Sequence, residues 1–282
     1  MRFTLSSTAL SSKLFALAKV ISNKNSLPIL ADFMFRTEGN TLFITASDSE
    51  NSMTTTIELS DSDIDDSFAI ENHSLLEAVK SFPEQPLTFE ADKNDKIVKI
   101  IYQNGQFSLP IESADVYPVA AKIADIAVSI QLSSALLSEN ISRCLCATAQ
   151  DELRPVMNGV FFDITPEYLT IVSTDGHKLV RNRIYDIKND VAASLILAKK
   201  PATILKNMLA KDDTLVTITF DNRNAEVTFG DTRLLCRLID GRYPNYNSVI
   251  PQNNQNVLHV DRETLLGALK RVLPFASDSS NL

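Results

Sequence analysis

The sequence predicts an α+β protein built by internal duplication, in which short helices pack against antiparallel sheets. Two observations predict this class. First, residues 127 positions apart correspond over more than forty positions, as Phe35 corresponds to Phe162 and Asp48 to Asp175. Second, each copy alternates short strand-like segments with stretches of helical spacing. We therefore expect successive copies of one βαβββ unit, present twice in each domain.

Three domains are predicted from this repeat. The chain has 282 residues, enough for two domains or slightly more at roughly 150 residues each. The first domain is expected at 1–125 and the second at 126–250. A third copy begins near Leu258, so residues 251–282 form an incomplete third domain. A helical stripe without its sheet would remain uncovered, and we therefore expect the natural protein to be longer.

Each copy is expected to begin with a strand that leads, through serines able to cap a helix, into a helical stretch. A loop with a proline, more strands and a second short helix follow. In copy one the strands are expected at 3–5, 32–36, 41–46 and 53–59, and the second helix at 75–82. In copy two the strands are expected at 130–132, 159–163, 168–173 and 178–184, and the second helix at 202–209.

Composition is that of a globular protein, with 44% hydrophobic and 22% charged residues. No window approaches 18 uninterrupted apolar residues, and the first residues lack the apolar core of a signal peptide, so we expect a cytoplasmic protein without a membrane span. The three cysteines are expected to be reduced core residues. No glycine pattern able to hold a nucleotide phosphate occurs.

Charge is distributed unevenly between the predicted helices and the rest of the chain. The formal net charge is −8, which alone argues against a nucleic-acid ligand. The five helical stretches 8–24, 73–81, 133–150, 199–211 and 262–271 together have a net charge of +9, which leaves −17 for the other residues. Basic helices that face together would suit a polyanion, although lysines also commonly solvate outer helix faces. Without interleaved aromatic residues, contact is expected with a backbone and not with bases.

The segment Thr174 to Leu179, TDGHKL, is the most distinctive candidate for chemistry. In an enzyme, Asp175 could orient His177 as a general base, with Ser173 or Thr174 as nucleophile. Residues so close in one tight turn rarely converge on a substrate, and Asp48 has no equivalent histidine nearby. Catalysis is therefore disfavoured, and three scattered histidines disfavour a metal site.

A second distinctive segment, DGRYPNY at 240–246, predicts a turn with exposed aromatic side chains that also links two domains. Together with MRFTL at the N-terminus, LPIL at 27–30 and TDGHKL at 174–179, it resembles the bacterial sliding clamps, the beta subunits of the DNA polymerase III holoenzyme. The resemblance extends over the whole chain in order. It implies a DNA-clamp fold: two chains of three domains each, joined head to tail in a ring, with sheets outside and helices around duplex DNA.

The resemblance also implies that the protein has no catalytic activity, cofactor or metal, and that a separate ATP-driven loader opens the ring. It implies a groove for short peptides of the replicative polymerase, the loader and other partners. The groove residues carried over to this sequence are Met157, Thr174, Gly176, His177, Lys178, Leu179, Pro244, Ser248 and Val249. Lys178 and Ser248 stand where the family often has arginine, and the far wall of the groove is expected from the third domain.

Lys24, Gln150 and Arg154 resemble the duplex-contacting positions of the family, although Pro155 and Val156 replace aromatic residues found in some members. The seam between two chains is expected where an edge strand with Phe107 and Leu109 meets Pro274 and Phe275 of the partner.

Without most of a third domain, the chain itself is expected to be a monomer at micromolar concentration. The alternative function is a repeat-built scaffold that binds proteins but does not encircle DNA.

Overall fold

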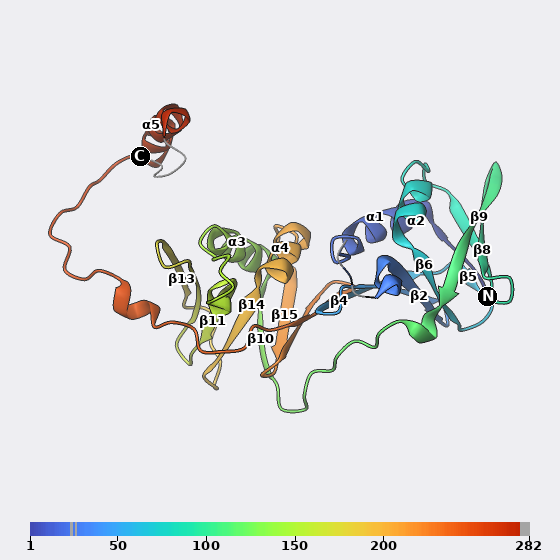
Figure 1. Cartoon of the computed structure of the whole chain (residues 1–282), viewed down its shortest axis with the longest axis horizontal. Coiled ribbons are helices and arrows are strands. Elements are labelled where there is room, and N and C mark those ends of the chain that lie inside the picture. Colours follow the sequence, from blue (N-terminus) through green and yellow to red (C-terminus); the bar gives the residue numbers. More distant parts are fainter. Residues whose placement is uncertain (23–24, 26, 277–282) are drawn as a thin grey trace. The chain divides into compact units, whose positions relative to one another are not determined.

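A computed structural model describes residues 1–22, 25 and 27–276 of the chain. Two compact units are present, Met1–Tyr243 and Pro244–Leu282. Figure 1 shows the first unit as a long array of strands with helices packed along it. The predicted α+β class is confirmed, because the strand pairs of the described residues are antiparallel and helices connect the strands.

The first half of this unit is the N-terminal copy of the repeat. Its helices α1 and α2 pack against each other and are separated in the sequence by five strands. The elements are β1 (Arg2–Ser6), α1 (Ser7–Leu17), β2 (Asp32–Glu38), β3 (Thr41–Ser47), β4 (Asn51–Glu58), β5 (Asp61–Ser62), β6 (Ser67–Glu71), α2 (Asn72–Val79), β7 (Pro86–Asp92), β8 (Ile97–Tyr102) and β9 (Gly105–Ser113).

The second half repeats this order without an equivalent of the short strand β5. Its helices α3 and α4 pack side by side, as α1 and α2 do. The elements are β10 (Val128–Ser133), α3 (Ser134–Leu145), β11 (Gly159–Ile164), β12 (Leu169–Thr174), β13 (Leu179–Ile184), β14 (Ala193–Ala198), α4 (Lys199–Met208), β15 (Leu215–Phe220), β16 (Asn224–Phe229) and β17 (Thr232–Arg237). In the second unit, α5 spans Arg262–Val272.

Hydrogen bonds at equivalent positions confirm the duplication. Ser6 caps α1 by accepting a bond from the Ala9 N–H at 3.2 Å, and Ser133 caps α3 from Leu136 N–H at 3.3 Å. These are the capping serines that the sequence predicts. The capping hydrogen bond of the first copy therefore recurs in the second copy, 127 residues later in the chain.

The first helix of each copy is shorter than the sequence analysis expects. Helix α1 ends at Leu17 and not near residue 24, and α3 ends at Leu145 and not near 150. After α1 the backbone turns, with the Val20 N–H donating to Leu17 O at 3.0 Å, and the Val20 side chain is fully buried. The chain thus leaves the helix before Val20, whose side chain lies in the core. Lys19 consequently lies outside α1, and the helices have less positive charge than expected.

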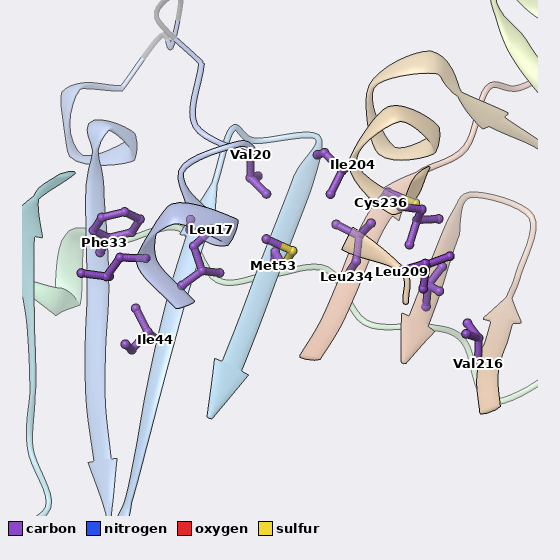
Figure 2. Packing of buried hydrophobic residues seen from close by; sticks show 14 of the residues in the cluster. Leu17, Val20, Phe33, Ile44, Met53, Ile204, Leu209, Val216, Leu234 and Cys236 are labelled. Atoms are coloured by element: carbon purple, nitrogen blue, oxygen red, sulfur yellow. The ribbon is translucent and has the colours of Figure 1, made fainter. Parts of the chain in front are cut away.

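The two copies are joined by one strand ladder. Five residues of β17 pair with five of β4 in antiparallel register, so that Leu234 lies opposite Met53. Figure 2 shows both side chains in a shared core with Leu17 and Val20 of the first copy and Ile204 of the second. A 13-stranded sheet therefore runs through both copies. The predicted domain boundaries near residues 125 and 250 stay predictions.

Three ion pairs surround the β4–β17 junction. Lys13 pairs with Asp231, and Lys200 of α4 pairs with Asp48. A longer pair joins Arg237 Nε and Glu50 Oε2 at 3.7 Å. The junction thus combines a backbone ladder, an apolar core and charged contacts. Within the residues described, none of the helices is long and apolar enough to cross a membrane.

Replacing Leu234 by alanine should lower the free energy of unfolding by about 2–5 kcal/mol, because Leu234 is fully buried where the two copies meet. Urea denaturation followed by circular dichroism measures this loss. The matched control is Leu215→Ala, at a leucine that is 56% exposed. Equal losses in the two variants would contradict a tightly packed junction.

Candidate functional site

The turn that connects β12 to β13 is a closed hydrogen-bonded unit. Thr174 Oγ1 donates to Lys178 O at 2.8 Å and accepts from the Gly176 N–H at 3.1 Å. Asp175 Oδ1 accepts from the His177 and Lys178 N–H groups, each at 2.9 Å. Gly176 has a φ of +90°, a conformation that favours glycine. This geometry exposes the His177 and Lys178 side chains.

The bonds within this turn argue against the catalytic hypothesis. The two N–H groups of Lys178 and His177 lower the pKa of Asp175 to about 2, so its carboxylate stabilises the turn and stays ionised. The buried Ser173 hydroxyl donates to Cys144 O at 2.6 Å and is not available as a nucleophile. Asp48 makes the same kind of turn in the first copy, accepting from the Glu50 and Asn51 N–H groups at 3.1 and 2.7 Å. The motif is therefore structural in both copies.

A buried tyrosine supports the turn by accepting a hydrogen bond from its backbone. The Thr174 N–H donates to Tyr243 Oη at 3.0 Å, and the Tyr243 ring stacks on Phe161 with centroids 4.5 Å apart. Burial raises the pKa of Tyr243 to about 12. The expectation of exposed aromatic side chains in 240–246 is therefore wrong for both tyrosines, since Tyr243 is 6% exposed and Tyr246 is 5% exposed. The alignment of Tyr243 with Tyr117 in the repeat is the sequence feature that could have indicated this burial. Tyr117 is also buried in the core of its copy.

Three of the residues predicted from the family resemblance meet beside this turn. A Cβ atom on Gly176 would lie 3.4 Å from Arg154 Nη1 and 3.7 Å from Met157 Cε. Met157 is buried at the end of a short 3-10 helix, Pro155–Met157. The structure thus brings Met157, Gly176 and Arg154 together. Arg154, expected at the DNA, lies beside the predicted peptide groove and pairs with Asp151 Oδ2 at 2.8 Å.

The other predicted groove residues lie at two places. Leu179, half-buried, begins β13 directly after the turn. Pro244, Ser248 and Val249 belong to the second unit, where the Ser248 hydroxyl donates to Asn245 O at 2.7 Å. The first unit therefore contains a buried methionine, a rigid turn and exposed polar side chains, which is the chemistry expected of a peptide-anchoring wall.

Basic side chains line two open clefts on the helices of the second copy. A cleft of about 640 Å³ between α3 and α4 has Arg143, Lys206 and Lys211 at its rim. A second cleft of about 440 Å³ is lined by Lys19, Lys199 and Lys200 together with Thr203, Ile204 and Asn207. Positive charge on helices is predicted from the sequence, but none of these lysines is among the predicted DNA contacts. Of the predicted contacts, Gln150 is exposed after α3 and Lys24 lies outside the described residues.

The predicted seam residues Phe107 and Leu109 are half-buried on β9. In the β8–β9 ladder, Phe107 lies opposite Ile100 and Leu109 lies opposite Val98. In the β16–β17 ladder, Leu234 lies opposite Val227 and Cys236 lies opposite Ala225 in the same way. Phe107 and Leu109 are therefore the structural counterparts of Leu234 and Cys236 at the internal junction. Pro274 and Phe275 lie in a short 3-10 helix of the second unit.

Comparison with known proteins identifies relatives over nearly the whole chain. Residues 1–121 match the N-terminal domain of the DNA polymerase III beta subunit, and residues 131–245 match its central domain. The beta sliding clamp of Pseudomonas putida is 25% identical over 273 residues, which are 96% of this chain and 74% of that protein. The beta sliding clamp of Bacillus subtilis is 26% identical over 289 residues, covering 100% of this chain and 76% of the relative.

Solved structures agree with these relatives. The crystal structure of the DNA polymerase sliding clamp from Bacillus subtilis superposes with a TM-score of 0.91 at 26% identity, over 99% of this chain and 75% of that one. A sliding clamp from Pseudomonas aeruginosa bound to griselimycin has a TM-score of 0.92 at 23% identity, over 100% of this chain and 76% of that one. The chain thus has the sliding clamp fold and spans about three quarters of the length of these relatives.

Replacing Tyr243 by phenylalanine should lower the free energy of unfolding by about 1–3 kcal/mol, because the buried Thr174 N–H loses its acceptor. Thermal and urea denaturation measure the change. Tyr185→Phe is the matched control, since Tyr185 is 63% exposed. An unchanged stability in Tyr243→Phe would mean that the hydroxyl does not support the turn.

Proposed function

The chain belongs to the DNA polymerase III beta subunit family of bacterial sliding clamps, and on this basis we propose that it is a processivity factor that encircles duplex DNA. The family is non-enzymatic. In this proposal the protein tethers the replicative polymerase to its template and needs no cofactor. It works in the cytoplasm, where bacterial replication takes place.

The single observation that supports the ring is the β4–β17 junction. It is a head-to-tail contact, since a late strand of one copy pairs with an early strand of the other. Heterologous contacts of this kind close into rings when the rotation between copies permits. The Gly105–Pro110 part of β9 pairs only with β8 among the described residues, although its counterpart β17 pairs on both sides. In our proposal this remaining edge forms the seam with a second chain, giving a homodimer of the full-length protein.

The predicted seam residues fit this role by their repeat positions. Phe275 stands 255 positions after Val20, and Pro274 stands 255 after Lys19. Val20 is fully buried at the internal junction, beside Ile204 in Figure 2. An apolar residue at 275 is therefore suited to fill the same place against the Phe107 and Leu109 edge of a partner.

We propose that the DNA lies against the basic clefts of α3 and α4. Lys199, Lys206 and Lys211 supply positive charge there, and no regular array of base-reading side chains accompanies them. Such contacts neutralise phosphates without reading sequence. Lys24, Gln150 and Arg154 are proposed as further duplex contacts. Because Arg154 lies beside Gly176, it is equally suited to meet a bound peptide.

We propose that partner peptides bind at the turn after β12. Met157 supplies a buried apolar anchor, while Gly176 leaves space beside it. The exposed side chains of His177 and Lys178 and the start of β13 at Leu179 would fix the peptide by polar and apolar contacts. Pro244, Ser248 and Val249 of the second unit are proposed as further groove residues from the family resemblance alone. The occupants of the groove are the polymerase catalytic subunit, the clamp loader and other proteins with a clamp-binding peptide.

A topological assay distinguishes this function from a scaffold that does not encircle DNA. The protein expressed from its complete gene is loaded by its cognate loader onto nicked circular DNA, washed at high salt and then exposed to a restriction enzyme. A clamp should remain on the circle through salt that removes electrostatic binders, and should leave when the circle is cut.

Phe107→Glu provides the internal control for that assay, because a charge at the proposed seam should prevent retention on the circle. Val119→Glu, at a valine that is 92% exposed, should load normally. Retention on the linear product would mean direct binding and would overturn the ring. Failure to bind DNA at all, with peptide binding intact, would favour the scaffold.

A further inference from the structure

A cavity of about 290 Å³ lies at the β4–β17 junction, between the two copies of the repeat. Residues of α1 and β4 line it from the first copy, and residues of α3, α4 and the β16–β17 hairpin line it from the second. Its volume is at the lower end of the range found for small-molecule sites. This junction cavity shares no residue with the proposed peptide groove or with the basic clefts of α3 and α4.

We propose that the junction cavity is a binding site for a small aromatic carboxylate. The aromatic ring would occupy the apolar floor of the cavity, and the carboxylate would accept hydrogen bonds from Lys13. Such a ligand would contact both copies of the repeat and would stabilise their junction. The site goes beyond the proposed clamp function and does not depend on it.

The floor of the cavity is apolar and suited to an aromatic ring. Leu17 of α1 and Met53 of β4 are fully buried and lie in the core that Figure 2 shows. Met208 and Phe229, both half-buried, line the cavity from the second copy. Methionine side chains adapt their shape to a ligand, and their sulfur atoms make favourable contacts with aromatic rings. Phe229 offers a ring contact as well.

An ion pair between the two copies also lines the cavity. Lys13 Nζ of α1 pairs with Asp231 Oδ2 of the β16–β17 turn. The other oxygen, Asp231 Oδ1, accepts from the hydroxyls of Thr55 and Thr232 at 3.3 and 3.1 Å. Burial works to raise the pKa of Asp231, but Lys13 and the two hydroxyls outweigh it and lower that pKa. Asp231 is therefore ionised, and both of its oxygens already have partners.

The unused hydrogen-bonding capacity of this pair belongs to the lysine. An ammonium group has three N–H bonds, and Asp231 is the one acceptor that Lys13 Nζ contacts among the described residues. A ligand carboxylate can accept from the remaining N–H bonds, and such charge-assisted hydrogen bonds are strong. A ligand ammonium would have to displace Lys13 or a threonine hydroxyl from Asp231. The cavity therefore favours an anionic ligand over a cationic one.

A ligand can reach the cavity at the β16–β17 turn. Gly230 lines the cavity, is exposed and has a φ of +54°, a conformation that favours glycine. A Cβ atom at this position would meet nothing within 4 Å, so the space beside the turn is open. On the opposite side, Ala16 of α1 lines the cavity with a single methyl group. A larger side chain at position 16 would fill the space that the ligand needs.

The size of the cavity sets the expected affinity. A ligand with about 11 non-hydrogen atoms, such as 3-phenylpropanoate, should bind with a Kd on the order of 1 mM. Because the ligand binds only the folded junction, about 10 mM of it should raise the melting temperature by about 2–4 °C.

Methyl NMR of the 282-residue chain with labelled methionines tests the proposal directly, using 3-phenylpropanoate as the probe. The methyl resonances of Met53 and Met208 should shift with a common Kd, because both side chains line the cavity. Met34 and Met157 lie elsewhere in the fold and should not shift. A shift of Met157 without Met53 and Met208 would mean binding at the proposed peptide groove and would overturn the proposal.

Two further probes test the charge of the ligand on the unaltered chain. The alcohol 3-phenylpropanol has the same ring and chain without a charge, and it should bind about fivefold more weakly, the effect of one partly exposed ion pair. The cation 2-phenylethylammonium should cause no shift of Met53 or Met208 at the same concentration. Equal affinity for the acid and the alcohol would overturn the assignment of a carboxylate ligand.

Variants of the two walls complete the test, with the fold checked by circular dichroism. Lys13→Met should weaken binding of the acid about fivefold and leave binding of the alcohol unchanged. Lys122→Met, at an exposed lysine outside the cavity, is the matched control and should bind as the unaltered chain does. Ala16→Leu should abolish binding of both probes.

Met53 and Met208 resonances that stay unshifted at about 10 mM acid would overturn the proposal, since that concentration is well above the expected Kd. Binding that survives Ala16→Leu would also overturn it. If Lys13→Met does not fold, the comparison of acid and alcohol on the unaltered chain decides the same point. Retention on circular DNA tests the ring separately, and none of these outcomes bears on it.

Discussion

A ladder of five residue pairs between β4 and β17 is the contact on which the rest of the structure depends. Without it, the β4 edge of one copy and the β17 edge of the other would be unpaired, and unpaired edges are sites of uncontrolled association. The ladder uses one edge from each copy and buries Met53 and Leu234 against each other. The strands that remain at sheet edges include β13 and the Gly105–Pro110 part of β9, which are the repeat counterparts of β4 and β17.

Duplication preserves the backbone at the β-turns while changing what the turns do. Ser49 and Gly176 occupy equivalent positions and both have positive φ, 78° and 90°. In the first copy the aspartate of this turn receives Lys200 from the neighbouring copy. In the second copy the same turn lies beside Met157 and leaves its polar side chains exposed. Both copies thus share the geometry of this turn. The residues around the turn differ, so that it contacts the other copy in one case and borders the proposed groove in the other.

Strand positions and the starts of α1 and α3 could be predicted from the sequence, because alternation and capping serines are local signals. Helices α2 and α4 lack a capping serine and begin at Asn72 and Lys199, three residues before the predicted starts. The early end of α1 could not be predicted, since Val20 lies at the junction with the other copy, where its side chain is fully buried and its carbonyl accepts from Lys200 Nζ. Tyr243 was misjudged for the same reason, because its partners Thr174 and Phe161 are about 70 to 80 residues away in the sequence. Met157 and Gly176 came from family resemblance, and only the structure brings Arg154 to them.

The charge distribution explains how an acidic chain can be suited to DNA without binding it tightly. Lys13 and Lys200, two of the lysines on the helices, are neutralised by Asp231 and Asp48 at the junction. Lys199, Lys206 and Lys211 line the clefts and form no ion pair among the described residues. In the proposed function, the attraction for a phosphate backbone is therefore spread over a few lysine side chains. A weak, sequence-independent field permits sliding, so retention must come from closure of the proposed ring and not from affinity.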